Sequence, residues 1–334
     1  MEGLTESCIG SSPDPLPAPV PEGLVAYRLR VGAVGAERAI TLLEGPAGWG
    51  EYSPLPGYPC VPAMAWQAAV EAASVGWPAP LRDAVPVNAL VTSADFDAAA
   101  LAGYSAVKVK MRTPDDVALV AAVRAAVEPT VKLRVDANAA WDLDTAIDVL
   151  RALEPYDLEL AEQPVATLEE LAVLRRRVSV PLAADEALRT LDDARRLRAL
   201  DAADAIVLKV QPLGGVRAAM AIAEAAGVAA IPSSMMETSV GIAAGLALAA
   251  ALPELPYACG LATASLLAGD LTATPLLAEH GILRVRSVVP DPELLARYRE
   301  VASVPESGSG SGSPDGLLPS QATNASATSS GRSR

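Results

Sequence analysis

The chain has 334 residues, of which 51% are hydrophobic and 4% are aromatic, and its formal net charge is −14. This length and this apolar content are sufficient for a large core in one or two domains. The acidic balance argues against a nucleic-acid surface or a polybasic contact with a membrane. Cys8, Cys60 and Cys259 form no metal-binding spacing, so we expect reduced thiols in a cytoplasmic protein. The single histidine, His280, cannot supply a multi-histidine metal site or a charge relay.

The two ends of the chain differ in composition from the part between them. Residues 1–22 are rich in proline, serine and glycine without periodicity, which predicts a disordered leader and no secretory signal. Residues 304–334 are of low complexity and predict a disordered tail. The longest apolar run, residues 240–252, is short for a membrane span and is typical of a buried helix. We therefore expect no membrane segment, and we expect the chain to act as a monomer.

Residues 23–84 predict a small α+β capping domain. Residues 24–31 and 39–54 read as strands of an antiparallel sheet, and residues 62–77 read as a helix. We expect a C-terminal return, from about 264–303, to complete this domain.

Between residues 85 and 263, short apolar strands alternate with helical segments rich in alanine, leucine and arginine. This alternation predicts parallel strands with crossover helices: an α/β fold, a TIM barrel of the (β/α)7β type, as the catalytic domain. A doubly wound open sheet is the rival, but no G-x-G-x-x-G follows a strand and opens a helix, so its dinucleotide-binding version loses support. The predicted strands are 85–91, 106–111, 131–138, 158–164, 180–186, 204–210, 228–234 and 257–263. The predicted helices are 115–127, 143–153, 168–178, 191–200, 214–227 and 239–252.

Lysine is rare in this chain, with four residues against 22 arginines. Arginine stays charged in proteins, so a side chain that must release and recover a proton cannot be arginine. Lys108 and Lys110 share one face of the strand at 106–111 and should point into the barrel, and Lys209 approaches from the opposite side. Two close ammonium groups lower each other's pKa, which would make a lysine a usable base near neutral pH. Lys132 begins its strand and is expected at the surface.

Three carboxylates, Asp136, Glu162 and Asp185, end successive predicted strands. They follow Lys110 at intervals of 26, 26 and 23 residues, and Lys209 comes 24 residues later. Each interval is one strand–helix unit, so these residues should lie at one height at the C-terminal end of the barrel, where barrel active sites are built. An oxygen-only ligand set predicts Mg²⁺, with Mn²⁺ as a substitute. A divalent metal opposite a lysine suits removal of a proton next to a carboxylate, because the metal takes up the charge of the enediolate.

Short stretches around these residues form a recognisable set: KVK (108–110), DANAAW (136–141), EQP (162–164), ADE (184–186) and LKVQPLGG (208–215). In them the chain resembles the enolase superfamily, specifically its muconate-cycloisomerase-like branch; a lysine base with Mg²⁺ is a known pattern of that superfamily. Three further stretches are GPAGWGEYSP (45–54), SSMMETSVG (233–241) and ALPELPYACGLAT (251–263). In these the chain resembles the o-succinylbenzoate synthases of the actinobacterial type, and the whole resemblance covers roughly residues 24–290.

The resemblance implies a Mg²⁺-dependent lyase of menaquinone biosynthesis. Its reaction would be the syn-dehydration of 2-succinyl-6-hydroxy-2,4-cyclohexadiene-1-carboxylate to 2-succinylbenzoate, so the expected partner is a small-molecule carboxylate. Asp136, Glu162 and Asp185 are implied to ligate the metal. Lys110 is implied to be the general base and then the general acid, and Lys209 to stabilise the enediolate from across the ring.

Other residues are implied to support the site or to bind the substrate. From the sequence alone, Arg134 either pairs with carboxylates structurally or meets an anionic substrate. Glu237 either completes a capping box or pairs with a cation. The residues given a supporting or substrate-binding role are Lys108, Arg134, Asn138, Glu186, Gly214, Gly215, Ser233, Ser234 and Glu237.

Two alternatives stay open. An N-acylamino acid racemase or a dipeptide epimerase would use the same site, with Lys110 and Lys209 as bases on opposite faces; the stretch 233–239 favours the synthase. A barrel that only binds a ligand would be expected to lack one of the lysines or carboxylates, and none is missing.

Overall fold

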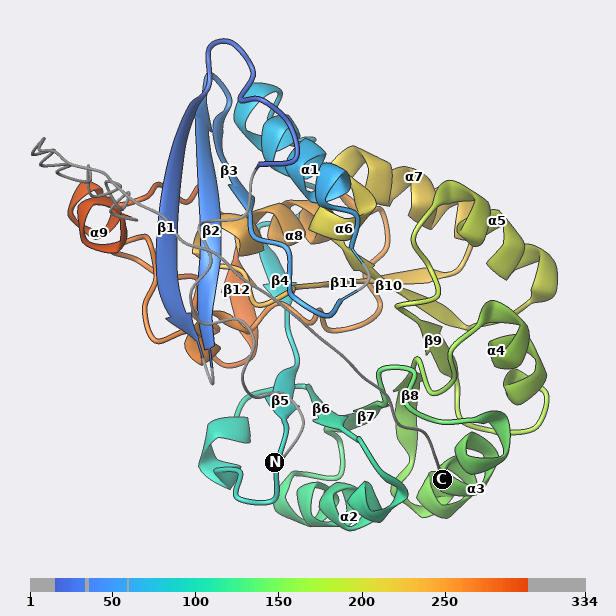
Figure 1. Ribbon diagram of the computed structural model, residues 1–334. Helices are drawn as coiled ribbons and strands as arrows, with labels where there is room; N and C mark the ends of the chain where they lie inside the picture. The colour runs from blue at the N-terminus through green and yellow to red at the C-terminus, as the bar shows by residue number, and fades with distance from the viewer. Residues whose placement is uncertain (1–15, 34–35, 59, 300–334) are drawn as a thin grey trace, which may run out of the picture. The chain divides into compact units, whose positions relative to one another are not determined.

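The computed structural model describes residues 16–33, 36–58 and 60–299, so the predicted tail at 304–334 lies outside the described part. Within these ranges, a three-stranded antiparallel sheet with a helix precedes a curved parallel sheet surrounded by helices (Figure 1). No helix of the described ranges is long and apolar enough to cross a membrane.

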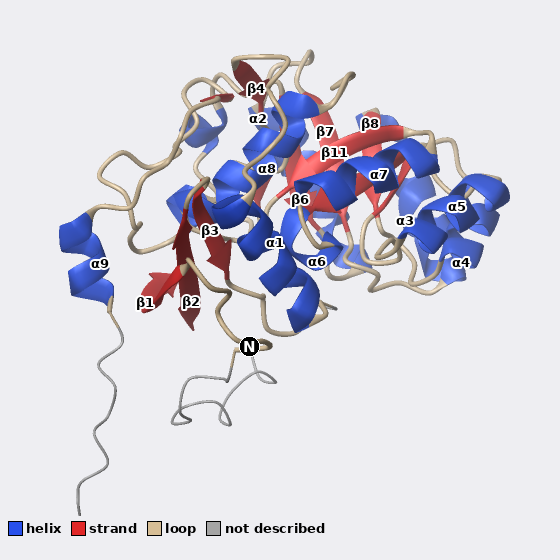
Figure 2. Cartoon of the chain, turned by 90° about the horizontal axis from the view of Figure 1, so that it is seen from above, coloured by secondary structure: helices blue, strands red, loops and turns tan. Residues whose placement is uncertain are grey.

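The larger part is the predicted barrel. Among the described residues, seven parallel strands pair in the order β11-β10-β9-β8-β7-β6-β5, so each strand lies beside its sequence neighbour. The helices that join them cover the outer face of the sheet (Figure 2), as strand–helix alternation predicts. The strands are β5 (Ala89–Val91), β6 (Ala106–Lys110), β7 (Lys132–Asp136), β8 (Leu158–Glu162), β9 (Leu182–Ala184), β10 (Ala205–Lys209) and β11 (Ala229–Ser233). The helices are α2 (Val117–Ala126), α3 (Leu143–Leu153), α4 (Leu168–Arg175), α5 (Leu191–Leu200), α6 (Val210–Leu213), α7 (Val216–Ala226) and α8 (Ser239–Ala251).

A short segment closes the barrel at the position of the predicted last strand. Backbone hydrogen bonds run from Cys259 N to Pro86 O (2.8 Å) on one side and from Gly260 N to Pro232 O (2.9 Å) on the other. A Cβ on Gly260 would lie 2.4 Å from Ser233 Oγ, so glycine permits this close pairing. The predicted TIM-barrel fold is therefore confirmed, with isolated bridges in place of a regular last strand.

Helix α3 illustrates why the predicted helices form. The Asp142 side chain accepts a hydrogen bond from Thr145 N (2.8 Å) and caps the N-terminus. Apolar residues recur at helical spacing, and Ile147, Leu150 and Leu153 are buried in the core that helices and strands share. Leu150 is fully buried, so truncating it to alanine should cost about 2–5 kcal/mol of stability.

The smaller part is the capping domain. Its strands β1, β2 and β3 pair antiparallel in chain order, and α1 packs against β3. A Cβ on Gly50 would lie 2.0 Å from Ala69 O, so glycine allows the helix to approach the sheet closely. The elements are β1 (Val25–Ala33), β2 (Ala36–Gly45), β3 (Gly48–Tyr52) and α1 (Pro62–Ser74).

The end of the predicted leader has a defined place in the structure. Leu16, Ala18 and Val20 pack against the apolar cluster of β2 and α1. Residues 1–15 of the predicted disordered leader lie outside the described part, whereas in the rest of the leader these three apolar side chains are partly buried.

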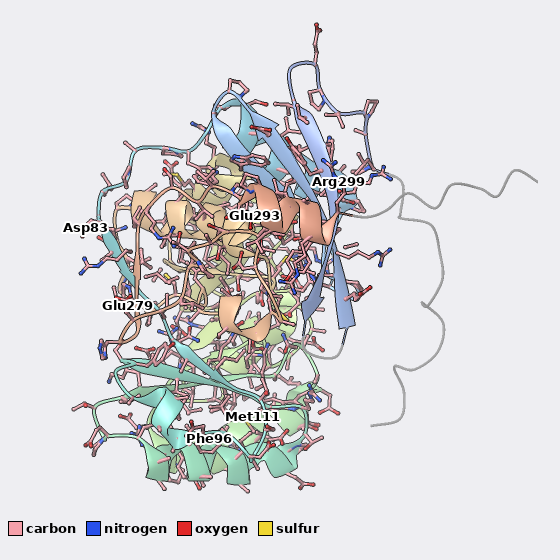
Figure 3. All side chains as sticks on the ribbon, turned by 90° about the vertical axis from the view of Figure 1, so that its left-hand side faces the viewer. Asp83, Phe96, Met111, Glu279, Glu293 and Arg299 are labelled. Carbon is pink, nitrogen blue, oxygen red and sulfur yellow. The ribbon has the colours of Figure 1, made fainter. Side chains whose placement is uncertain are left out.

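The C-terminal return packs against the capping domain. Strand β12 (Ile282–Arg284) pairs antiparallel with β4 (Ala84–Pro86). Helix α9 (Pro292–Tyr298) lies beside β1, where Arg299 forms a backbone bridge to Leu29. Figure 3 labels Glu293 and Arg299 at this edge. The return thus contributes side chains to the core beneath the first sheet.

A buried polar cluster joins β3 of the capping domain to the start of α8. Glu51 accepts hydrogen bonds from Ser53 Oγ (2.6 Å), from Gly241 N (2.9 Å) and from the Thr238 hydroxyl. Burial raises the pKa of Glu51 to about 7 and also raises the pKa of the neighbouring Glu237. A buried carboxyl group is costly without partners, and these donors offset part of that cost.

We expect Glu51→Gln to remove a pH dependence of stability. Because its pKa is raised, Glu51 keeps its proton in the folded protein between about pH 4.5 and pH 7, whereas the unfolded chain releases it. Its stabilising contribution is therefore complete at low pH and is lost as the pH rises through about 7. Urea unfolding at about pH 5 and about pH 8 measures the effect: the stability of the wild type relative to the variant should fall over this interval.

Glu37→Gln is the matched control, because Glu37 is exposed on β2 of the same sheet. Arg38 and Glu237 are the other charged groups that face Glu51, and both stay unchanged in the two variants. Equal pH slopes for the wild type and Glu51→Gln would contradict the expectation.

Candidate active site

Strand register brings charged residues to one level. Lys110 at the end of β6 pairs across the sheet with Asp136 at the end of β7, which pairs with Glu162 at the end of β8. Asp185 follows directly after β9, and Lys209 ends β10. All five residues therefore lie at the C-terminal end of the barrel, where the loops leave the strands.

Asp136, Glu162 and Asp185 form a row of carboxylates. Lys108 and Lys110 both donate hydrogen bonds to this row. Lys108 Nζ lies 2.9 Å from Asp136 Oδ2 and 3.0 Å from Glu162 Oε1. Lys110 Nζ lies 2.6 Å from Asp136 Oδ2 and 2.7 Å from Asn138 Oδ1. The two lysines thus share Asp136, and each has a second oxygen partner of its own.

Lys209 reaches the row from the other side. Its ammonium group donates to Asp185 Oδ2 and lies 4.2 Å from the centre of the Tyr58 ring. The next carboxylate, Glu186, accepts a hydrogen bond from Asn138 Nδ2 at 2.9 Å. Lysines therefore flank the carboxylates on both sides, and Asn138 connects the two sides.

The charges in this row shift one another's pKa. Burial, together with the adjacent charge of Asp136, raises the pKa of Glu162 above its usual range. Burial would also raise the pKa of Asp136, but the ammonium groups of Lys108 and Lys110 hold it well below its usual range. Burial would lower the pKa of Lys108 and Lys209, yet the carboxylates around them raise it. The net pKa shift at Lys108 and Lys209 is therefore upward, because the nearby carboxylates outweigh burial and, at Lys108, also the like charge of Lys209.

Asp136, Glu162 and Asp185 have the donor chemistry of a Mg²⁺ site but are engaged by lysines. In the part of the chain that the structure describes, no group of three or more histidine, cysteine, aspartate or glutamate side chains converges as a formed metal site. Lys108 bridges Asp136 and Glu162, and Lys209 occupies an oxygen of Asp185. The residues still fit a hard divalent cation, since three buried carboxylates on adjacent strands offer oxygen ligands only.

Two further residues, Gln163 and Tyr58, contact this site but could not be found from the regular spacing of the strands. Gln163 has a positive φ of 38°, and its Oε1 accepts hydrogen bonds from Asp185 N (2.6 Å) and Ala187 N (3.2 Å). It therefore fixes the turn that carries Asp185; its place beside Glu162 in the EQP stretch is the signal that points to it. Tyr58 donates its hydroxyl to Asp185 Oδ1 at 3.0 Å. It comes from the loop after β3, so the barrel repeat could not reveal it.

Arg134 has structural partners. It lies in register with Lys108, two residues before the end of β7. Its Nε donates to Glu159 Oε2 (2.5 Å) and its Nη1 to Ala258 O (2.7 Å), and its guanidinium group lies 5.5 Å from the centre of the Tyr257 ring. Of the two alternatives for this residue, the contacts favour structural pairing.

Gly214 and Gly215 lie against α1 of the capping domain. Both have positive φ, 87° and 126°. A Cβ on Gly214 would lie 2.6 Å from Met64 Cε, and one on Gly215 would lie 1.9 Å from Glu71 Oε2. Glu71 also accepts a hydrogen bond from Val216 N (2.8 Å) at the start of α7. These contacts assign the glycines to close packing with α1 and give no support to a role in the substrate pocket.

Ser233, Ser234 and Glu237 line one small pocket at the C-terminal end of β11. Ser234 Oγ forms a hydrogen bond with Thr263 Oγ1 (2.7 Å). Glu237 accepts a hydrogen bond from Gln211 Nε2 (3.3 Å) and belongs to the buried cluster around Glu51. Its partners are thus uncharged donors with a guanidinium group nearby, and no substrate contact is needed to explain its burial.

Comparison with known proteins agrees with this arrangement along most of the chain. Residues 28–73 match the family model described as enolase N-terminal domain-like, and residues 92–291 match the one described as enolase C-terminal domain-like. The o-succinylbenzoate synthase of Thermobifida fusca is 53% identical over 265 residues, which cover 76% of this chain and 84% of that protein. The o-succinylbenzoate synthase of Mycolicibacterium smegmatis is 46% identical over 286 residues, which cover 82% of this chain and 88% of that protein.

Solved structures show the same fold. The muconate cycloisomerase of Pseudomonas fluorescens superimposes with a TM-score of 0.73, covering 84% of this chain and 99% of that protein. At 24% identity this likeness concerns the fold alone. The family models and the curated relatives carry the assignment further: the chain belongs to the enolase superfamily and, within it, to the family of the o-succinylbenzoate synthases.

Proposed function

We propose that this protein is an o-succinylbenzoate synthase, a lyase that converts 2-succinyl-6-hydroxy-2,4-cyclohexadiene-1-carboxylate to 2-succinylbenzoate and water in menaquinone biosynthesis. The observation that carries the proposal is the placing of Lys110 and Lys209 on either side of the carboxylate row, paired with Asp136 and Asp185. The identity to curated synthases supports it independently.

Lys110 is the group best placed for acid–base work. Its side chain is 26% exposed, against 10% for both Lys108 and Lys209, so a substrate can reach it. We assign it removal of the proton on the ring carbon that bears the carboxylate. The same ammonium group then returns a proton to the hydroxyl that leaves from that face, so one bond to hydrogen and one to oxygen break and water is released.

The remaining charged groups stabilise the negative charge that forms after proton removal. Asp136, Glu162 and Asp185 would hold Mg²⁺, with Mn²⁺ as a substitute, and the bound ion would neutralise charge on the carboxylate oxygens of the substrate. Lys209 faces the site from β10 and stabilises the enediolate electrostatically. Lys108 lies between Asp136 and Glu162 and keeps the charges of the row balanced.

The chemistry of the site suits a small carboxylate and not a macromolecule. The ammonium groups attract an anion, whereas the net charge of −14 disfavours nucleic acid. We propose a monomer that acts in the cytoplasm; the free thiols of Cys60 and Cys259 are consistent with a reducing compartment.

A spectrophotometric dehydration assay with the cyclohexadiene carboxylate tests the function. We expect rapid conversion to 2-succinylbenzoate with Mg²⁺ present and loss of conversion after EDTA treatment, with recovery when Mg²⁺ is restored. No conversion by folded, Mg²⁺-bound protein would refute the proposal and would favour racemisation of an N-acylamino acid at the same site.

We expect Lys110→Ala and Lys110→Arg to lower kcat by about 10²- to 10⁴-fold, because neither side chain can cycle a proton. Lys132→Arg is the matched control, since Lys132 is exposed at the start of β7. Circular dichroism checks that the variants are folded. Substantial turnover by Lys110→Arg would exclude Lys110 as the base.

We expect Asp185→Asn to raise the Mg²⁺ concentration needed for half-maximal activity by roughly tenfold or more, because it removes a charged oxygen ligand. Asp204→Asn serves as a control, since Asp204 pairs with Arg175 just before β10, at the opposite end of the strands. A Mg²⁺ titration of the initial rate measures the effect, and an unchanged midpoint would contradict the proposed ligand set.

A further inference from the structure

Tyr58 belongs to the capping domain but makes its polar contacts in the barrel. Its hydroxyl donates to Asp185 Oδ1 at 3.0 Å, and Lys209 Nζ lies 4.2 Å from the centre of its ring. Tyr58, Asp185 and Lys209 line one narrow pocket together. One side chain of the capping domain therefore touches both a proposed metal ligand and a proposed catalytic lysine.

The two contacts of Tyr58 act differently on the charged pair. The ring face attracts the Lys209 ammonium group through its quadrupole and leaves the charge of the lysine unchanged. The hydroxyl, in contrast, occupies one oxygen of Asp185 and fixes the orientation of that carboxylate. Lys209 thus has a partner that does not depend on Asp185.

The loop that carries Tyr58 is clamped to the same turn that carries Lys209. Gln211, two residues after Lys209, accepts a hydrogen bond from Ser53 N (2.9 Å) through Oε1 and donates to Ser53 Oγ (3.1 Å) through Nε2. The Arg38 guanidinium group donates to Ser53 O. The start of the loop is therefore fixed to the turn that directly follows Lys209.

We propose that Tyr58 is a positioning residue of this active site, which holds Lys209 through its ring and orients Asp185 through its hydroxyl. The inference rests on the proposed function for the roles of Lys209 and Asp185, and it names a contact of Lys209 that would remain if a bound cation engaged Asp185. Without the ring, the ammonium group would lose the partner that aims it at the reacting face.

Tyr58→Leu and Tyr58→Phe separate the two contacts, because phenylalanine keeps the ring and loses the hydroxyl. We expect Tyr58→Leu to lower kcat about tenfold while KM changes by no more than a factor of about two. Tyr58→Phe should retain most of kcat but need a higher Mg²⁺ concentration for half-maximal activity, because the hydrogen bond that orients the Asp185 carboxylate is lost. Tyr156→Leu and Tyr156→Phe are the matched controls, because Tyr156 precedes β8 at the opposite end of the barrel.

Acetylation of lysines in the full-length, metal-free protein gives a readout that does not depend on turnover. Limited acetic anhydride treatment and peptide mass spectrometry give the rate at Lys209 relative to exposed Lys132. We expect this ratio to rise at least about threefold in Tyr58→Leu and to stay near the wild-type value in Tyr58→Phe.

The two measurements separate this inference from the proposed function. An unchanged ratio in folded Tyr58→Leu, or an equal loss of kcat in Tyr58→Leu and Tyr58→Phe, would overturn the role of the Tyr58 ring. Failure of the wild type to dehydrate the cyclohexadiene carboxylate would refute the proposed function, whereas the acetylation ratio would still decide whether Tyr58 holds Lys209.

Discussion

The structure depends on the pairing of buried charges at the C-terminal end of the barrel. Asp136, Glu162 and Asp185 are almost completely removed from water, and so are Lys108 and Lys209. Isolated ions in such a place would cost several kcal/mol each, so they persist only because opposite charges lie within hydrogen-bond distance.

The interior of the barrel below the charged residues is largely apolar. Leu160, Val207 and Ile231 belong to a separate buried cluster inside the sheet. The side chains of the barrel strands form layers, and an apolar layer leaves the charged row no alternative partners below it. Arg134 is the exception, and Glu159 and Ala258 O satisfy two sides of its guanidinium group.

Polar contacts as well as apolar ones tie the capping domain to the barrel. Glu51 binds the start of α8, Glu71 binds the start of α7, and Gln211 binds Ser53. Each of these contacts involves a buried or partly buried polar group, which would exchange its protein partner for water if the two parts moved apart. The start of the loop that bears Tyr58 is therefore anchored, through Ser53, to the turn that follows β10.

The sequence by itself determined the barrel and the charged row. One strand–helix unit is a local period, so residues that recur at that period, such as Asp136, Glu162 and Asp185, end neighbouring strands. Only the tertiary structure decided which charges pair, and the carboxylates that it places beside Lys108 and Lys209 raise the pKa of both lysines. The sign of such a shift depends on which charge lies nearest, and spacing along a chain does not give distances between side chains.

The capping-domain contacts were likewise decided by the tertiary structure alone. Tyr58 is 127 residues from Asp185, and Ser53 is 158 residues from Gln211. No periodicity joins segments of a small antiparallel sheet to the ends of barrel strands, because their contact follows from how two separately formed parts pack. Gly214 and Gly215 follow the same rule. The sequence suggests a tight turn at this pair, but it does not reveal their neighbours Met64 and Glu71, which belong to helix α1 of the capping domain.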